Sequence, residues 1–357
     1  MIRRGRKALY GAIVLALGFT LAACGGGNDA SPTTATVSTP AAPSGPPPSV
    51  TPAVTPAVTP AVTPTATTLT ASVSSLTLSV NDPSLNAALT GNPRHLTITN
   101  TGTADALDVT VTMSPSLPAG ATVSPTSCAT IPAGGSCVLT FTPGATPTAA
   151  VGSTSPLPDV ASIVGSNTNT LTSEISVVTY GSVYQSGYVF SVDDSTVNTG
   201  SIGAKVAALT DQSTGVGWSP GLTNTGASSL TDGASNSSVI LAANSASPST
   251  SYAAGLCSQT QGGYSDWYLP AICELGYGAS ASCGTSASPL TQNLQSSLVD
   301  NGNVGAISGN YWSSSEYSPS PQIGAWYQYA ASGGGSYQGA AVKTNAVGVR
   351  CVRAATN

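Results

Sequence analysis

The first pattern in the chain is a series of short runs in which apolar side chains alternate with Ser and Thr over residues 69–180. The clearest runs are Ser75–Val80, His95–Thr99, Leu107–Met113, Cys137–Thr142 and Ser162–Val178. Turn-forming sequences such as Asn100–Gly102 and Pro132–Gly135 separate them. Alternation with a period of two, without a helical period, indicates half-buried strands. We therefore expect a β-sandwich over residues 69–180.

Residues 181–357 show a mixed pattern and hold all four tryptophans. The expected strands are Tyr188–Val192, Lys205–Leu209, Trp326–Tyr329 and Gly348–Val352. The expected helices are Asn236–Ala254, which is interrupted at Pro248, Pro270–Leu275, which has its proline in the first turn, and Thr291–Val299. Helices mixed with antiparallel strands and long loops indicate an α+β domain. The fold class is therefore mostly β, a sandwich followed by an α+β head.

The N-terminus has the order of a secretory signal. Basic residues precede the apolar segment Ala8–Leu21, which is shorter than the roughly 20 residues that span a bilayer. The following Leu21-Ala22-Ala23-Cys24 resembles the lipobox of bacterial lipoproteins. The resemblance implies a signal peptide over residues 1–23 and lipid on Cys24, which would anchor the chain to a membrane. Since Asp does not follow Cys24, the expected location is the outer membrane, with exposure at the cell surface.

Residues 24–68 are rich in Thr, Pro, Ala and Val, and Thr-Pro-Ala-Val repeats at Thr51, Thr55 and Thr59. Proline at every fourth residue blocks helix and sheet and favours polyproline II. We expect a stalk that can reach on the order of 100 Å from the lipid surface.

Charge and histidine content exclude several kinds of site. Once the signal peptide is removed, five basic residues face fourteen carboxylates, a net charge of −9. A nucleic-acid partner held by a basic patch is therefore not expected. No Cys-x-x-Cys pair occurs and His95 is the sole histidine, so we expect no zinc site and no cofactor.

Six cysteines remain besides Cys24, and disulfides are the default for an exported chain. About 15 pairings are possible, and about three keep each pair within its own segment. We favour Cys128–Cys137, Cys273–Cys283 and Cys257–Cys351.

Three motifs in the last 175 residues resemble one bacterial domain family. They are Asp266-Trp267-Tyr268-Leu269-Pro270 with Glu274, then Tyr311-Trp312-Ser313-Ser314-Ser315-Glu316, and then Val349-Arg350-Cys351-Val352-Arg353. They resemble the domain at the C-terminus of the collagen-like adhesin Lcl. The resemblance implies a C-type-lectin-like fold over residues 181–357 and a role in adhesion. The earlier stretch Leu96–Thr103 is similar to one in bacterial immunoglobulin-like envelope domains, which implies that the sandwich is a spacer.

The Lcl domain binds sulfated glycosaminoglycans, but the head of this chain has four cations against eight carboxylates. A neutral glycan or a protein is therefore the expected ligand. We expect the family-motif residues Asp266, Trp267, Pro270, Glu274, Trp312, Glu316 and Arg350 to be structural. Glu274 should cap a helix, and Glu316, in a loop after Trp312, should pair with Arg350.

Binding is expected from loop residues Tyr317, Gln322, Tyr337 and Gln338. In Trp326–Tyr329, alternation places Tyr327 and Tyr329 on one face, which could stack on a sugar if the other face is core. The head has no histidine, so we expect no catalytic triad and no enzyme. The favoured function is a surface adhesin that binds a glycan or protein, and the oligomeric state is left open. The alternatives are a structural envelope protein with a self-associating head and, third, a glycan-active enzyme.

Overall fold

The computed structural model describes residues 63–154, 157–302, 304 and 307–355. The predicted signal peptide, the lipid site Cys24 and the stalk up to residue 62 lie outside these residues. Residues Ala61–Asn357 form one compact unit. Within it, the described residues are mostly β, and no sheet contains strands from both sides of residue 180.

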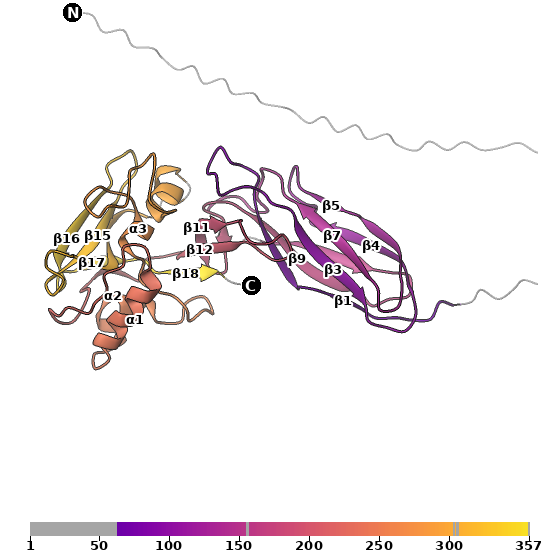
Figure 1. Ribbon diagram of the computed structural model, residues 1–357, viewed down its shortest axis with the longest axis horizontal. Coiled ribbons are helices and arrows are strands. Elements are labelled where there is room, and N and C mark those ends of the chain that lie inside the picture. Colours follow the sequence, from indigo (N-terminus) through magenta and orange to yellow (C-terminus); the bar gives the residue numbers. More distant parts are fainter. Residues whose placement is uncertain (1–62, 155–156, 303, 305–306, 356–357) are drawn as a thin grey trace, which may run out of the picture. The chain divides into compact units, whose positions relative to one another are not determined.

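The first part of the unit is a sandwich of two sheets (Figure 1). One sheet has the order β1 (Leu69–Ala71), β3 (Arg94–Asn100), β7 (Ser136–Thr142), β5 (Thr122–Ser124). The other has the order β2 (Ser75–Ser79), β9 (Leu171–Val178), β8 (Asp159–Val164), β4 (Ala106–Ser114), β6 (Ser127–Ile131). Alternate side chains such as Leu96, Ile98 and Ile163 are buried and share one core. The alternation in the sequence therefore reports the inward face of each strand.

The predicted strands of the sandwich are present, with one division. The run Ser162–Val178 forms two antiparallel strands, β8 and β9, because the chain turns at Gly165–Thr168 between them. β1, β5 and β6 were not predicted. β1 and β5 have only three residues each, and the sequence of β6 (SCATI) does not alternate apolar and polar side chains.

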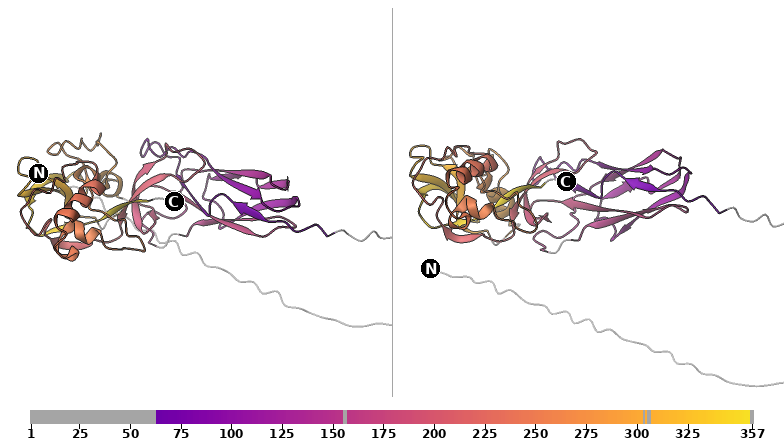
Figure 2. Two further views of the ribbon diagram at one scale, coloured as in Figure 1. Left: turned by 60° about the horizontal axis from the view of Figure 1, so that its bottom comes forward. Right: turned by 90° about the horizontal axis from the view of Figure 1, so that it is seen from below.

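The head contains two further sheets and three short α-helices (Figures 1 and 2). One sheet has the order β10 (Val183–Tyr184), β11 (Gly187–Asp193), β12 (Gly203–Ala208), β18 (Val352–Ala355). The other has the order β13 (Ser213–Val216), β17 (Val347–Val349), β14 (Gly309–Glu316), β15 (Gly324–Ala330), β16 (Tyr337–Val342). The helices are α1 (Gly233–Ala243), α2 (Ala253–Cys257) and α3 (Ile272–Leu275), with a 3₁₀ turn at Ser249–Ser251 and a π-helical segment at Gln295–Asp300.

Four expected elements of the head differ in detail. The helix expected over Asn236–Ala254 ends at Ala243 as α1, before the 3₁₀ turn, and the helix expected over Thr291–Val299 is the π-helical segment Gln295–Asp300. The predicted last strand, Gly348–Val352, divides at Arg350–Cys351, because β17 belongs to one sheet and β18 to the other. The helix expected at Pro270–Leu275 begins two residues later, and Ala271 is its N-cap. Pro270 therefore lies before the cap and not in the first turn.

A buried ion pair joins the sandwich to the head. Arg94, at the start of β3, is fully buried and donates from Nη2 to Asp194 Oδ1 at 2.5 Å. The other oxygen of Asp194 accepts hydrogen bonds from Ser79 Oγ (2.7 Å), Thr90 Oγ1 (2.5 Å) and the Asn92 amide (3.0 Å). Burial raises the pKa of Asp194, but these hydrogen bonds together outweigh it and lower that pKa. One carboxylate of the head is thus held by four groups of the sandwich.

The three disulfides are the pairs favoured from the sequence, Cys128–Cys137, Cys257–Cys351 and Cys273–Cys283. The first joins β6 to β7 and hence the two sheets of the sandwich. The second ties α2 to the segment between β17 and β18, where the chain crosses between the sheets of the head.

Candidate binding surface

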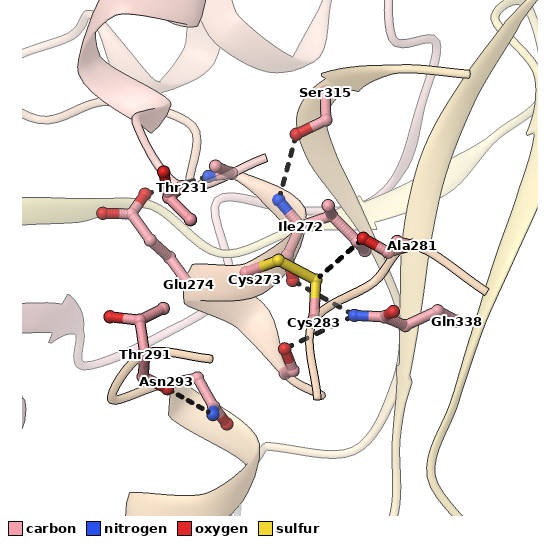
Figure 3. The surroundings of a disulfide bond; sticks show 12 residues. Thr231, Ile272, Cys273, Glu274, Ala281, Cys283, Thr291, Asn293, Ser315 and Gln338 are labelled. Carbon is pink, nitrogen blue, oxygen red and sulfur yellow. Dashed lines mark hydrogen bonds between the residues drawn. A yellow bond between two sulfur atoms is a disulfide. The ribbon is translucent and has the colours of Figure 1, made fainter. Parts of the chain in front are cut away.

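The three serines of β14 form a buried polar frame. Ser313 Oγ donates to the carbonyl oxygen of Trp326 (2.9 Å), and Ser314 Oγ accepts from Asn236 Nδ2 of α1 (3.2 Å). Ser315 Oγ accepts from the amide of Ile272 at the start of α3, which Figure 3 shows (3.1 Å). All three serines are 0% exposed. They connect β14 to two helices and a neighbouring strand, which is a structural role.

Glu316 ends β14 and is buried, whereas the sequence placed it in a polar loop and paired it with Arg350. Its actual partner is Lys343, whose ammonium lies 2.5 Å from Glu316 Oε1 and 4.2 Å from the ring centre of Trp218. The Glu316 carboxylate also accepts from the amides of Thr225 (2.8 Å) and Gly226 (3.2 Å). Burial lowers the pKa of Lys343, and the charge of Glu316 opposes this shift.

The expected pairing of Glu316 with Arg350 is wrong because of strand register. β17 pairs with β14 through Tyr311 and Gly348, near the start of β14, whereas Glu316 is at its end. Arg350 instead donates from Nε to Asp211 Oδ1 (2.7 Å) and from Nη1 to the carbonyl oxygen of Ala208 (2.7 Å).

Glu274 is 1% exposed and caps α3, as the sequence predicted. Its Oε2 accepts from the amides of Ala271 (2.9 Å) and Gly233 (3.2 Å). Its Oε1 accepts from the hydroxyl of Tyr268 (3.1 Å) and from the ammonium of Lys205. All four contacts satisfy groups of the protein itself, which is a structural role.

Asp266 and Arg353 form a two-pronged ion pair at 2.7 and 3.0 Å. The guanidinium lies 3.8 Å from the ring centre of Tyr264 and 5.9 Å from that of Trp267. The hydrogen bond from Arg353 lowers the pKa of Asp266. Trp267 itself is 4% exposed and Trp312 is 0% exposed, so both belong to the core.

These pairs together occupy every lysine and arginine of the described residues. The pairs are Arg94–Asp194, Lys205–Glu274, Lys343–Glu316, Arg350–Asp211 and Arg353–Asp266. Lys205 is the most exposed of the five cations, at 37% of its side chain. Among the described residues, no cationic patch is therefore available for a polyanion.

The four binding residues predicted from the sequence do not form one site. Gln338 is 7% exposed and lies in β16, where its amide donates to the carbonyl oxygens of Ile272 and Gly276 (3.4 Å each; Figure 3). Tyr317 is half-buried, with its ring edge against Trp326 at 5.0 Å. Gln322 is exposed in the same β14–β15 turn. Tyr337 lies at the opposite end of β15 and is 48% exposed. The loop assignment of Gln338 is therefore wrong, because its polar side chain is bonded to α3.

Tyr337 instead belongs to a group of three tyrosines, Tyr327, Tyr329 and Tyr337, that we call the tyrosine platform. Tyr329 is directly opposite Tyr337 across β15 and β16, and their rings stack with centres 5.1 Å apart. The rings of Tyr327 and Tyr337 meet edge to face at 6.2 Å. Trp326 and Gln328, on the other face of β15, are buried. The alternation read from the sequence therefore correctly separates the two faces.

The backbone of β16 makes room for the tyrosine platform. A Cβ atom on Gly339 would lie 2.6 Å from Cζ of Tyr327, so the ring lies directly over this glycine. Burial, followed by a hydrogen bond with Tyr337, raises the pKa of Tyr327, and the phenol stays neutral at physiological pH. Asn310 is exposed and sits opposite Tyr329 on β14. The surface is thus aromatic and uncharged, with an amide at its border.

Two kinds of feature are absent from the described residues. These residues contain no group of three or more His, Cys, Asp or Glu side chains placed to hold a metal ion. None of the helices in these ranges combines the length and the apolar character needed to cross a bilayer.

Residues 207–353 match the model of the family described as the Lcl C-terminal domain. This match lies inside the segment whose motifs predicted that family. Among solved structures, the chain is similar to PapD-like domain 7 of human CEP192, with 14% identity, a TM-score of 0.22 and coverage of 38% of this chain and all of that one. It is also similar to the E. coli chaperone DraB, with 12% identity, a TM-score of 0.21 and coverage of 30% of this chain and 53% of that one. A comparison with curated protein sequences found no match.

Proposed function

We propose that this chain is a lipid-anchored adhesin of the bacterial envelope whose head binds a neutral glycan on the tyrosine platform. The observation that carries the proposal is the platform itself, in which Tyr329 and Tyr337 stack in fixed positions with Tyr337 48% exposed. Aromatic faces bind the apolar face of a sugar ring, and rings that are already ordered lose little entropy on binding. Asn310 beside Tyr329 offers an amide to sugar hydroxyls.

Electrostatics support a neutral ligand over a sulfated one. All five cations of the described residues already have carboxylate partners, four of them in the head. Four of these five cationic side chains are at most 3% exposed, so a sulfate group could reach them only by breaking a pair, and breaking a buried pair is costly. The binding should therefore depend little on ionic strength.

The strand pairing of the head supports a lectin-like arrangement. The C-terminal strand β18 pairs with β12, which pairs with β11 near the start of the head. This brings the two ends of the domain together, as the C-type-lectin-like fold requires. In this proposal the sandwich is an immunoglobulin-like spacer between the stalk and the head.

The proposal predicts binding of neutral glycans by the full chain on a glycan array. A Cys24→Ser form would allow measurement without detergent. We expect Tyr337→Ala to weaken binding about tenfold, which corresponds to roughly 1.4 kcal/mol for the loss of one stacking ring. Tyr317→Ala, on the other face of the sheet, is the matched control and should bind like the wild type. Binding confined to sulfated glycans, or a blank array, would contradict the proposal.

The proposed lipid anchor on Cys24 can be tested separately. In cells grown with a traceable fatty acid, the wild-type chain should carry the label and fractionate with the outer membrane. Cys24→Ser should lose the label, because the thiol is the acceptor of the lipid. A labelled Cys24→Ser variant would show that the acyl chains are attached elsewhere.

A further inference from the structure

The outer edge of β16 has the form of a pairing surface. β16 ends the five-stranded sheet and, among the described strands, pairs only with β15, over the six residues Tyr337–Val342. Of the strands that end a sheet in the described part of the chain, it is the longest. A strand of this kind presents a row of backbone N–H and C=O groups that can accept another strand.

The register shows which groups point outward. The amide of Lys343, directly after β16, donates to the carbonyl oxygen of Ile323 (2.9 Å). Because antiparallel residues alternate between bonded and non-bonded pairs, Tyr337, Gly339 and Ala341 bond to β15. Gln338, Ala340 and Val342 then direct their backbone groups to the free edge. Of these groups, the Val342 carbonyl accepts the Asn345 amide within a turn (2.9 Å).

Two other edge strands, β2 and β18, have outward backbone groups that are hydrogen-bonded within the described residues, whereas the edge of β16 does not. Along the β2 edge, the amide of Thr77 donates to Ser201 Oγ (2.7 Å) and its carbonyl accepts from the Ile202 amide (3.1 Å). β18 is bridged by Tyr268, which exchanges two backbone hydrogen bonds with Val352. No such contact is made by the outward groups of Gln338 and Ala340 with the described residues.

Nothing in the sequence of β16 protects its edge. Soluble proteins usually place charges or proline on an open edge strand, and Tyr337–Val342 contains neither. The nearest charge, Lys343, is buried and paired with Glu316. Ala340 and Val342 are exposed, and Val342 is 40% exposed.

We propose that β16 pairs in antiparallel orientation with β16 of a second copy of this chain. A two-fold axis at Ala340 sets Ala340 opposite its own copy and Gln338 opposite Val342 of the other copy. Each outward N–H then faces an outward C=O, so the edge is complementary to itself. Its centre, Gly339-Ala340-Ala341, has small uncharged side chains, and two such strands approach without steric or charge conflict even though the mature chain is acidic.

This pairing has a consequence for ligand binding, and that consequence alone rests on the proposed function. An antiparallel pair within one continuous sheet keeps equivalent faces on the same side. The tyrosine platforms of both copies would lie on one face of a ten-stranded sheet, formed from two sheets of five. Two platforms on one face would allow bivalent binding of a repeating glycan.

Sedimentation velocity of the full Cys24→Ser chain over a concentration series tests the pairing. We expect a reversible monomer–dimer equilibrium in the wild type. Ala340→Pro removes an outward N–H without touching the bonds to β15, and should raise the dimer dissociation constant at least tenfold. Ala340→Ser is the matched control and should dimerise as the wild type does. A wild-type chain that stays monomeric, or an Ala340→Pro variant that dimerises unchanged, would overturn the proposal.

A cysteine scan gives a second readout that does not depend on the proline variant folding. Directly opposed residues in a bonded antiparallel pair have Cα atoms about 5.5 Å apart, which suits a disulfide. Ala340→Cys should therefore form a covalent dimer under mild oxidation, whereas Gln338→Cys alone should not. Equal cross-linking of these two variants and of Gln322→Cys, in the distant β14–β15 turn, would show that the contact is random. A β16 variant that no longer dimerises but still binds glycan would show that the pairing and the proposed binding function are independent of each other.

Discussion

Replacing Asp194 by alanine should lower the free energy of unfolding by about 3–5 kcal/mol, because it leaves Arg94 as an unpaired buried charge. Arg94 is 0% exposed, and its Nη2 has Asp194 as its partner at 2.5 Å. The same substitution also removes the acceptor for Ser79, Thr90 and the Asn92 amide. Chemical denaturation of wild type and variant at neutral pH measures the difference.

The neighbouring residue supplies the control for this prediction. Asp193 is exposed, and its carboxylate accepts only from Ser195. Asp193→Ala should therefore change the free energy of unfolding by less than about 1 kcal/mol. Because the folded-state pKa of Asp194 is lowered, its contribution is present above the unfolded value of 3.8 and is lost as the pH falls through the folded value. Similar losses from Asp193→Ala and Asp194→Ala would show that the buried pair does not hold the sandwich and head together.

Replacing Glu316 by alanine should also lower the free energy of unfolding by about 3–5 kcal/mol at neutral pH. Lys343 is 0% exposed and would keep its charge without its carboxylate partner. The amides of Thr225 and Gly226 would lose their acceptor as well, so residues 223–227 should exchange amide hydrogens faster. Denaturation and hydrogen exchange measure the two consequences separately.

The pH dependence of the stability of Glu316→Ala shows whether the unpaired charge of Lys343 causes the loss. Burial already lowers the pKa of Lys343, and the loss of Glu316 removes the interaction that opposes this shift. In the variant, the unfolded state then binds more protons than the folded state over the alkaline range, so stability rises with pH. The difference in the free energy of unfolding between wild type and Glu316→Ala should therefore shrink as the pH approaches 10. Glu174→Ala, an exposed carboxylate of β9, should show neither the deficit nor this trend.

The sequence predicted the elements whose faces differ in polarity. The alternation in β3 and β4 and on the two faces of β15 reflects burial directly, because every second side chain points to the core. The capping role of Glu274 was also visible, since a carboxylate in a first helical turn has a local partner in the free amides. Such features depend on residues close together in the chain.

Features that depend on register over long separations were not predictable. Glu316 pairs with Lys343 and not with Arg350, because the pairing of β15 with β16 sets where Lys343 lies. The polar run Ser313–Glu316 suggests a loop, yet it is the most buried part of the sheet. Its hydrogen bonds to other elements join residues 13 to 95 positions apart in the chain. A buried polar side chain looks like a surface one in the sequence unless its partners are known.

The family motifs and the tyrosine platform therefore occupy different parts of the head. The motif carboxylates Asp266, Glu274 and Glu316 pair with cations of the head, and the motif residue Arg350 pairs with Asp211. The tyrosine platform lies on a face of β15 and β16 outside the quoted motifs. A frame of this kind can keep its structure while the exposed residues on it vary, which fits a binding module.

We propose the tyrosine platform as the ligand-binding surface of the head, and substitution of its stacked rings tests this proposal. The most direct measurement compares array binding by Tyr329→Ala/Tyr337→Ala with that by Tyr317→Ala and wild type, all as full Cys24→Ser chains. We expect the double variant to lose at least a hundredfold in affinity for the neutral-glycan ligands, while Tyr317→Ala keeps them. Undiminished binding by the double variant, with its fold intact by circular dichroism, would show that the ligand does not bind on the tyrosine platform.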